Sequence, residues 1–148
     1  MSDILIIGGG IAGVSAAARL APHASVTLLE AEDSLAYHAS GRSAAMFLMD
    51  YGNDTVRALN YASADHHHNA DGGVLKQRAM MLLGKPDEAD TFTTEATSFN
   101  LDRISIDQAR ALVPILNPQT CAFAAIREDV HDLDTDLLIQ NYLRSARA

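Results

Sequence analysis

The sequence predicts an α/β fold that opens with a strand–helix–strand unit, and three features of the first 30 residues predict it. Residues 3–7 form a short apolar run, residues 11–20 are rich in alanine without a helix breaker, and residues 25–30 form a second apolar run. Short apolar runs with β-branched residues favour buried parallel strands, and alanine favours helix. Three glycines join the first run to the expected helix. We therefore expect a compact right-handed crossover unit.

The middle of the chain predicts alternating helices and strands. A loop over residues 31–45 leads into a short helix, and a longer helix is expected over residues 53–69. Turn residues at 71–73 then precede one or two strands over residues 74–83. Further on, we expect a helix over residues 87–97, a helix over residues 105–112 with Ser105 as its N-cap, and a short strand over residues 121–126.

The last element is an amphipathic helix over residues 136–147. Its apolar side is expected to carry Leu137, Leu138, Tyr142 and Leu143, and Asp134 or Thr135 can cap its start. A helix at the very end of the sequence has no following element to return to. We therefore expect the chain to be incomplete.

The composition indicates a globular protein and excludes some partners. Apolar residues make up 48% of the 148 residues, charged residues make up 20%, and the net charge is −8. A negative surface repels phosphate backbones and anionic lipids, so we expect neither nucleic acid nor membrane-surface partners. No segment approaches the roughly 20 apolar residues of a transmembrane helix, and the start lacks the basic region of a signal peptide. A single cysteine, Cys121, fits a reducing compartment, and we expect a cytoplasmic protein.

A glycine-rich turn follows the first expected strand. Gly8, Gly10 and Gly13 match the pattern G-x-G-x-x-G. In this pattern the first glycine makes a tight turn, the second admits a pyrophosphate to the backbone, and the third lets the helix pack closely on the strand. Glu30 ends the second expected strand 20 residues after Gly10, where a carboxylate accepts hydrogen bonds from ribose hydroxyls. The sequence therefore predicts a Rossmann-like unit that binds an adenine dinucleotide without a 2′-phosphate.

The segment after this unit favours FAD over NAD. Residues 37–46 read Tyr-His-Ala-Ser-Gly-Arg-Ser-Ala-Ala-Met, a loop of small residues that leads into an expected short helix. Such a loop offers a second set of backbone N–H groups, while Ser40 and Ser43 offer hydroxyls and Arg42 offers a positive charge. An NAD-binding unit usually continues directly into another crossover helix. An NAD-dependent dehydrogenase stays open as the alternative.

The chain resembles the glycine oxidase and D-amino-acid oxidase superfamily of FAD-dependent flavoproteins. Within that superfamily it is most similar to the bacterial D-arginine dehydrogenases. The resemblance rests on residues 6–13, on residues 37–45, on Tyr51-Gly52-Asn53 with residues 56–59, and on residues 132–136. It implies an FAD domain interleaved with an α+β substrate domain. Residues 1–73 would then form FAD-binding structure, residues 74–133 would begin the substrate domain, and residues 134–148 would return to the FAD domain.

The resemblance also implies which residues contact the ligands. Besides Gly8, Gly10 and Gly13, the implied FAD contacts are Ala12, Glu30, Ala31, Ala39, Ser40, Gly41, Arg42, Ser43, Ala44, Ala45 and Met46. Tyr51 would lie on the substrate side of the flavin, as an orienting or proton-relaying residue. Met46 replaces a histidine of the D-arginine enzymes, and Met80 replaces the glutamate that pairs with the substrate cation. Since a thioether cannot neutralise a guanidinium, we expect a neutral or apolar substrate.

The reaction implied by the resemblance is oxidation of the CH–NH bond of an amino acid, in the first instance a D-amino acid. A hydride would pass from the α-carbon to flavin N5, and the resulting imine would hydrolyse to a keto acid and ammonia. The electron acceptor would be oxygen or a quinone. The competing interpretation from another functional class is a truncated flavin-binding piece without turnover.

Other candidate sites have simpler explanations. His66, His67 and His68 are adjacent on an expected helix and point in different directions, so we expect no metal site there. Asp132, Asp134 and Asp136 suit helix capping, and Cys121 is expected to be a small core residue in an apolar strand.

Overall fold

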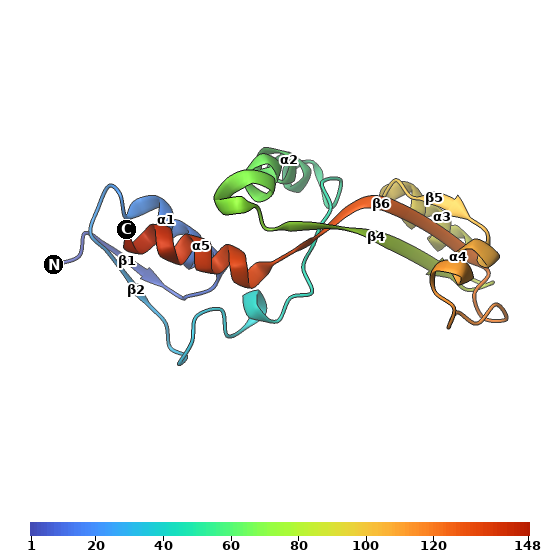
Figure 1. Ribbon diagram of the computed structural model, residues 1–148, viewed down its shortest axis with the longest axis horizontal. Helices are drawn as coiled ribbons and strands as arrows, with labels where there is room; N and C mark the ends of the chain where they lie inside the picture. The colour runs from blue at the N-terminus through green and yellow to red at the C-terminus, as the bar shows by residue number, and fades with distance from the viewer. The chain divides into compact units, whose positions relative to one another are not determined.

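A computed structural model describes all 148 residues, and they divide into two compact units. The first unit comprises Met1–Met46, Asp65–Lys76 and Asp132–Ala148, and the second comprises Phe47–Ala64 and Gln77–His131. The chain therefore leaves the first unit and re-enters it twice. Figure 1 shows the order of the helices and strands.

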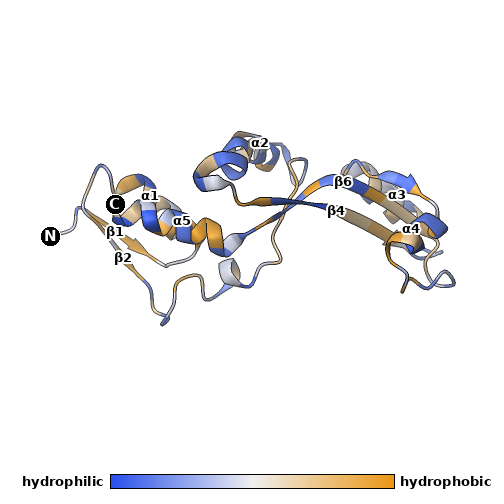
Figure 2. Ribbon diagram, in the orientation of Figure 1, coloured by the Kyte–Doolittle hydropathy of each residue, from blue (hydrophilic) through white to orange (hydrophobic).

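The first unit contains the expected strand–helix–strand arrangement. β1 (Ile4–Ile7) pairs in parallel with β2 (Val26–Leu29), and α1 (Ile11–Leu20) connects them. Both strands are mainly hydrophobic (Figure 2), and Thr27 of β2 is the exception. The helix buries Val14, Ala17 and Ala18. The prediction of a β-α-β unit is thus confirmed.

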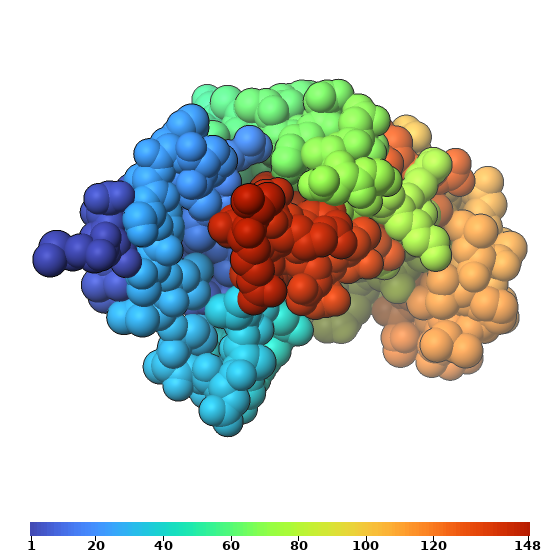
Figure 3. Space-filling model, turned by 60° about the vertical axis from the view of Figure 1, so that its left-hand side comes forward, coloured from blue at the N-terminus to red at the C-terminus, as the bar shows by residue number.

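The last helix, α5 (Thr135–Arg147), packs against α1. Figure 3 shows it in red against the blue residues of the first unit. Small side chains on α1 allow this approach, because helix separation depends on the side chains at the contact. The helix begins at the N-cap Asp134, whose side chain accepts a hydrogen bond from the Leu137 N–H at 2.8 Å. Of the two capping residues considered from the sequence, Asp134 is the one used.

The expected apolar side of α5 is wrong in part. Leu138 is buried as expected, but Leu137 is 37% exposed, and Ile139 and Asn141 are buried instead. The helix contacts both α1 and the short 3-10 turn η1 (Ala39–Gly41), so its buried arc is wider than one apolar stripe. The apolar pattern of the helix sequence alone does not reveal the contact with η1.

The second unit holds most of a four-stranded sheet, together with two helices and the first part of a third. The sheet order is β3 (Met46–Phe47), β6 (Phe123–Leu133) and β4 (Leu75–Gly84), and β5 (Asp102–Ile104) pairs antiparallel with β6. The helices are α3 (Ala89–Ser98), α4 (Ile106–Leu112) and the first part of α2 (Asp54–Asn69). The core comprises Phe92, Ala96 and Ala125 with Leu82, Leu101 and Phe123 around them. The rings of Phe92 and Phe123 stack at 5.4 Å.

Several local signals led to correct elements. The capping box of α4 is complete, since Ser105 Oγ accepts from the Gln108 N–H at 3.1 Å and Gln108 Oε1 accepts from the Ser105 N–H at 2.8 Å. The helix expected over residues 53–69 is found as α2. The segment 74–83, for which one or two strands were expected, forms the single strand β4.

Other expectations were wrong. The strand expected over residues 121–126 is β6, which begins at Phe123 and continues to Leu133, so Cys121 precedes it and lies half-buried outside any strand. The three consecutive charged residues between Ile126 and Val130 hid the continuation, because they match neither an apolar run nor the alternation of a half-buried strand. The two short strands β3 and β5 were also missed, because two or three residues carry no readable periodicity.

Candidate cofactor site

A sharp turn connects β1 to α1 at residues 8–13, which we call the glycine turn. Gly8 has φ of +102°, a conformation that favours glycine, and its N–H donates to the Leu29 carbonyl of β2 at 2.7 Å. A Cβ on Gly13 would lie only 1.9 Å from the Gly8 carbonyl oxygen. The start of α1 therefore lies against the end of β1, with no room for a side chain between them.

Gly9, which stands between the first two glycines of the motif, also has little room for a side chain. A Cβ on Gly9 would lie 2.2 Å from Leu35 and 3.0 Å from the Glu30 carboxylate. Sequence reasoning treated Gly9 as a free position, and the signal that marks it is the run of three consecutive glycines.

The amino terminus of α1 presents unpaired backbone donors. No side chain caps the helix at Gly10, and the N–H groups of Ala12 and Gly13 have no hydrogen-bond partner in the chain. The Ile11 N–H donates to Ser40 Oγ at 3.0 Å, which ties the 39–41 turn to the helix start. Free N–H groups together with the helix dipole attract anions, phosphates in particular.

Glu30 closes the other side of the glycine turn. Its Oε2 accepts from the Gly9 N–H at 2.6 Å, and its Oε1 accepts from the N–H groups of Ala31 at 2.7 Å and Glu32 at 3.1 Å. These backbone donors, first that of Gly9, hold the pKa of the Glu30 carboxyl below its usual value. Glu30 is therefore an anion that faces the turn.

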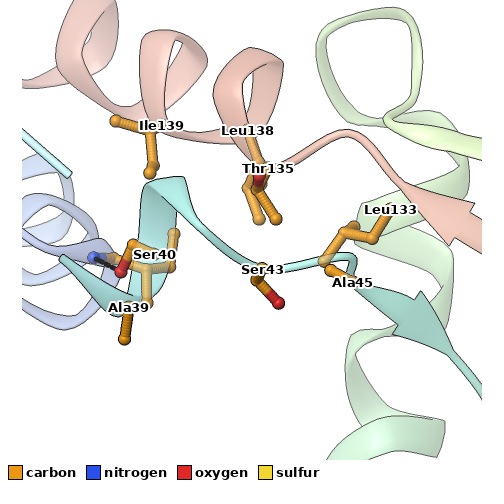
Figure 4. Close-up of a pocket in the computed structure, with 9 residues that line it drawn as sticks. Ala39, Ser40, Ser43, Ala45, Leu133, Thr135, Leu138 and Ile139 are labelled. Carbon is orange, nitrogen blue, oxygen red and sulfur yellow. Dashed lines mark hydrogen bonds between the residues drawn. The ribbon is translucent and has the colours of Figure 1, made fainter. Parts of the chain in front are cut away.

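Two hollows of the first unit share Ala39 and Ser40 in their linings. The smaller, of about 200 Å³, is lined by Gly10, Glu30, Ala36, Tyr37, His38, Ala39 and Ser40. The larger, of about 300 Å³, is mainly apolar and is lined by Ile11, Ala39, Ser40, Ser43, Ala45, Leu133, Thr135, Leu138 and Ile139. Figure 4 shows Leu138 and Ile139 directed from α5 toward the 39–45 segment. The structure thus brings together the glycine turn, Glu30 and part of the 39–45 loop.

Other expected cofactor residues do not line either hollow. Gly41 lies where a Cβ would be 2.3 Å from the Ala36 carbonyl oxygen, so it serves the packing of the loop. Arg42 donates from Nε to the Tyr37 carbonyl at 3.0 Å, and its guanidinium lies 4.9 Å from the Tyr37 ring centre. Ala44 is exposed, and Met46 in β3 is 41% exposed.

The two expected substrate residues belong to the second unit. Tyr51 is 59% exposed, and its ring stacks on that of Phe99 with centres 6.3 Å apart. Its hydroxyl has no hydrogen-bond partner in the chain. Met80 is half-buried in β4.

The histidine cluster of α2 has a local role. The His66 ring stacks on Tyr142 of α5 at 5.7 Å, and the Tyr142 hydroxyl shares a hydrogen bond of 3.0 Å with His66 Nε2. No three His, Cys, Asp or Glu side chains are grouped closely enough to hold a metal ion. No helix combines the length and the apolar content that a membrane crossing needs.

Comparison with known families shows the family of this chain. The family model described as DAO, FAD dependent oxidoreductase, matches residues 3–148. The chain belongs to the DAO family. Its cofactor is FAD, and the Rossmann-like fold of the first unit is the FAD-binding fold of solved family members.

The matched proteins have names that give different substrates. L-aspartate oxidase of Yersinia pestis is 48% identical over 50 residues, which are 32% of this chain and 9% of that protein. The FAD-bound L-α-glycerophosphate oxidase of Mycoplasma pneumoniae has a TM-score of 0.76 at 17% identity, covering 99% of this chain and 42% of that one. Glycine oxidase of Geobacillus kaustophilus has a TM-score of 0.76 at 19% identity, and the match covers 99% of this chain and 44% of that one. The chain thus spans less than half the length of these structures, and they establish the fold alone.

The residues of the DAO-family site fit FAD. The glycine turn leaves the backbone bare at Gly10, whose nearest neighbour for an added Cβ is the flexible Ser40 hydroxyl at 3.2 Å. Two free amides face this approach, and the Glu30 carboxylate stands beside it. These are the groups that a pyrophosphate and a ribose require.

Proposed function

We propose that this DAO-family chain serves an FAD-dependent oxidation of the CH–NH bond of an amino acid. The observation that carries the proposal is the Glu30 carboxylate held against the bare backbone of the glycine turn, next to the free amides of α1. The same proposal assigns residues 1–73 and 134–148 to FAD binding and residues 74–133 to the substrate side. When bound, FAD would supply the hydride acceptor for the α-carbon, and water would hydrolyse the resulting imine to a keto acid and ammonia.

Different residues of the chain would bind different parts of FAD. The amides of Ala12 and Gly13 would hold the pyrophosphate, with Ser40 beside them. A carboxylate has about four lone-pair positions, and three backbone N–H groups already use Glu30. Glu30 would therefore accept directly from one ribose hydroxyl. Its negative charge disfavours a 2′-phosphate at the same place.

The larger hollow suits the apolar part of the cofactor. Leu133, Leu138 and Ile139 supply an aliphatic surface, and Ser43 adds a hydroxyl at the edge. We propose that the flavin end of FAD passes along this hollow from the smaller one, because Ala39 and Ser40 border both. Arg42, which is held by Tyr37, would act on the loop and not on the cofactor.

The substrate side is proposed from Tyr51 and Met80. The Tyr51 hydroxyl is exposed and unpaired, so it can donate to or accept from the carboxylate or amine of an amino acid. The Met80 thioether cannot pair with a charged side chain. We therefore propose a neutral or apolar amino acid, with the D-isomer preferred, and we propose no cationic substrate in spite of the resemblance to D-arginine dehydrogenases.

An anaerobic titration tests this function without knowledge of the electron acceptor. The FAD-loaded protein is mixed with neutral D-amino acids, the corresponding L-isomers and D-arginine, and loss of the oxidised flavin absorbance is followed. Bleaching by neutral D-amino acids supports the proposal. Bleaching by D-arginine or by L-isomers alone contradicts the substrate assignment. Tight FAD binding without bleaching by any amino acid favours a flavin-binding chain without turnover.

A matched pair of variants tests whether Tyr51 contacts the substrate. Tyr51→Phe removes the exposed hydroxyl, and Tyr142→Phe removes the same group from α5. We expect slower bleaching or a weaker substrate affinity only in the first variant. Equal rates in both would show that Tyr51 does not contact the substrate.

A further inference from the structure

The loop that carries Tyr51 is held along its backbone by side chains of α2. Asn60 Nδ2 donates to the carbonyls of Leu48 and Tyr51, each at 3.3 Å. Arg57 Nε donates to the Asp50 carbonyl at 2.8 Å, and the Tyr51 N–H donates to the Leu48 carbonyl at 3.1 Å. The backbone on both sides of Tyr51 is therefore fixed.

Arg127 of β6, which is distant in sequence, adds two contacts to this region. Its Nη1 donates to Asp50 Oδ2 at 2.7 Å and to the Phe99 carbonyl at 3.1 Å. Its Nε and Nη2 donate to Asp129. The Asp50 carboxylate is completed by the Tyr61 hydroxyl at 2.6 Å. Both carboxylates hold the pKa of Arg127 above its usual value.

These two contacts hold the two residues that border the exposed Tyr51 ring, one in sequence and one by stacking. Asp50 precedes Tyr51 in the chain, and the Phe99 ring stacks on the Tyr51 ring with an angle of 7° between their planes. The Arg127 side chain is only 10% exposed, whereas Tyr51 is 59% exposed. Placing a mostly buried cation is costly unless it is fully paired. Here a paired cation anchors the two neighbours of a side chain that itself has no structural partner for its hydroxyl.

We propose that Arg127 is a positioning residue, which fixes the orientation of the Tyr51 ring through Asp50 and the Phe99 carbonyl. The inference rests on the proposed function in one respect, namely that Tyr51 contacts the substrate. The planar fork of arginine is required, because one guanidinium reaches an aspartate on each side and a carbonyl at the same time. Lysine, a single point charge, can keep only part of this set.

Aromatic NMR of the FAD-loaded protein tests the orientation directly. We expect the cross-relaxation signals between the Tyr51 and Phe99 rings to disappear in Arg127→Met and to weaken in Arg127→Lys. The matched control is Arg103→Met, which removes an exposed arginine of the same unit that contacts Thr93 and the Phe92 ring. The control is expected to keep the Tyr51–Phe99 signals. Unchanged signals in Arg127→Met would overturn the inference.

Kinetics separate this inference from the function on which it rests. With a neutral amino acid, Arg127→Met is expected to raise KM at least tenfold with a smaller change in kcat, and Arg127→Lys is expected to recover part of the loss. Loss of the ring signals with an unchanged KM upholds the positioning role and contradicts a substrate contact of Tyr51. Absence of any flavin reduction contradicts the proposed function, while the NMR result still decides the role of Arg127.

A second variant protects the test against misfolding. If Arg127→Met does not fold, Asp50→Asn keeps an acceptor for Tyr61 and removes the charge that pairs with Arg127. We expect weakened Tyr51–Phe99 signals in Asp50→Asn. Full signals there would count against the proposal.

Discussion

The substitution Gly13→Ala tests the close contact between β1 and α1 that shapes the cofactor site. The added Cβ would lie 1.9 Å from the Gly8 carbonyl oxygen and 3.1 Å from its carbon. Real Cβ atoms essentially never approach within 3.0 Å of another heavy atom, so helix and strand must separate by about 1.1 Å. The clashing atom is backbone, so no side-chain rotation relieves the contact.

The energetic effect of Gly13→Ala follows from two opposing terms. Forcing an extra methyl into a packed site costs about 1–3 kcal/mol, and the higher helix propensity of alanine returns up to about 1 kcal/mol. We expect a net destabilisation of about 1–2 kcal/mol. A displacement of about 1 Å also moves the free amides of α1 away from the pyrophosphate. Because of this displacement, we expect the affinity for FAD to fall at least tenfold, which corresponds to a loss of about 1.4 kcal/mol of binding free energy.

Chemical denaturation and titration of FAD by flavin fluorescence measure the two effects. The control is Gly72→Ala, where a Cβ meets open space but φ is +91°. Left-handed backbone costs an alanine about 1–2 kcal/mol, and Gly72 lines neither hollow, so this variant should lose stability but keep its FAD affinity. Wild-type stability and affinity in Gly13→Ala would refute the account of the glycine turn.

Three further predictions concern other parts of the chain. Glu30→Gln is expected to weaken FAD binding several-fold, because an amide cannot accept from all three backbone donors and lacks the charge; an affinity equal to wild type, measured by the same titration, would show that Glu30 does not contact the ribose. Asp50→Asn is expected to lower the free energy of unfolding by about 1–3 kcal/mol at neutral pH. Since the Tyr61 hydroxyl and then Arg127 lower the pKa of Asp50 in the folded state, this stabilisation is complete above the ordinary value of 3.8 and is lost as the pH falls below it. The difference between wild type and Asp50→Asn in thermal unfolding should therefore shrink only below about pH 4, and a difference that shrinks between pH 5 and 8 would contradict the assignment. Ser105→Ala should destabilise the protein by about 0.5–2 kcal/mol, whereas Ser105→Gly should cost only a few tenths, and equal losses would show that the capping box is not formed.

The parts of the fold that sequence reasoning predicted are those whose cause is local. The glycine turn, the capping box at Ser105 and the N-cap at Asp134 each depend on residues within a few positions of one another. The β-α-β unit adds only the pairing of two adjacent apolar strands. Such features need no knowledge of the rest of the chain.

The parts that were missed depend on contacts between distant residues. Arg127 and Asp50 are 77 positions apart, and neither lies in a motif that would single it out. Ile139 of α5 is buried in a helix that contacts α1 and the 39–41 turn, and it lines a hollow with residues of both. The strand predicted for β6 was too short because three consecutive charged residues, Arg127 to Asp129, interrupt the apolar run, and the distant Asp50 that pairs with the mostly buried Arg127 carries no local signal.

The site itself was predicted unevenly for the same reason. Gly10 and Glu30, expected from the glycine motif and its acid, line the smaller hollow together with Ser40, expected from the loop of small residues, and their contact with FAD stays a prediction. Arg42 was considered for its charge, yet its guanidinium is occupied by the Tyr37 carbonyl and ring. Composition alone cannot show whether a cation faces a ligand or its own loop.

The most direct test of the account is a crystal structure of the protein with FAD. We expect the pyrophosphate to lie across Gly10 within hydrogen-bond distance of the Ala12 amide, with one ribose hydroxyl on the Glu30 carboxylate. FAD bound elsewhere, or a Glu30 side chain turned away from the adenosine, would contradict the central claim.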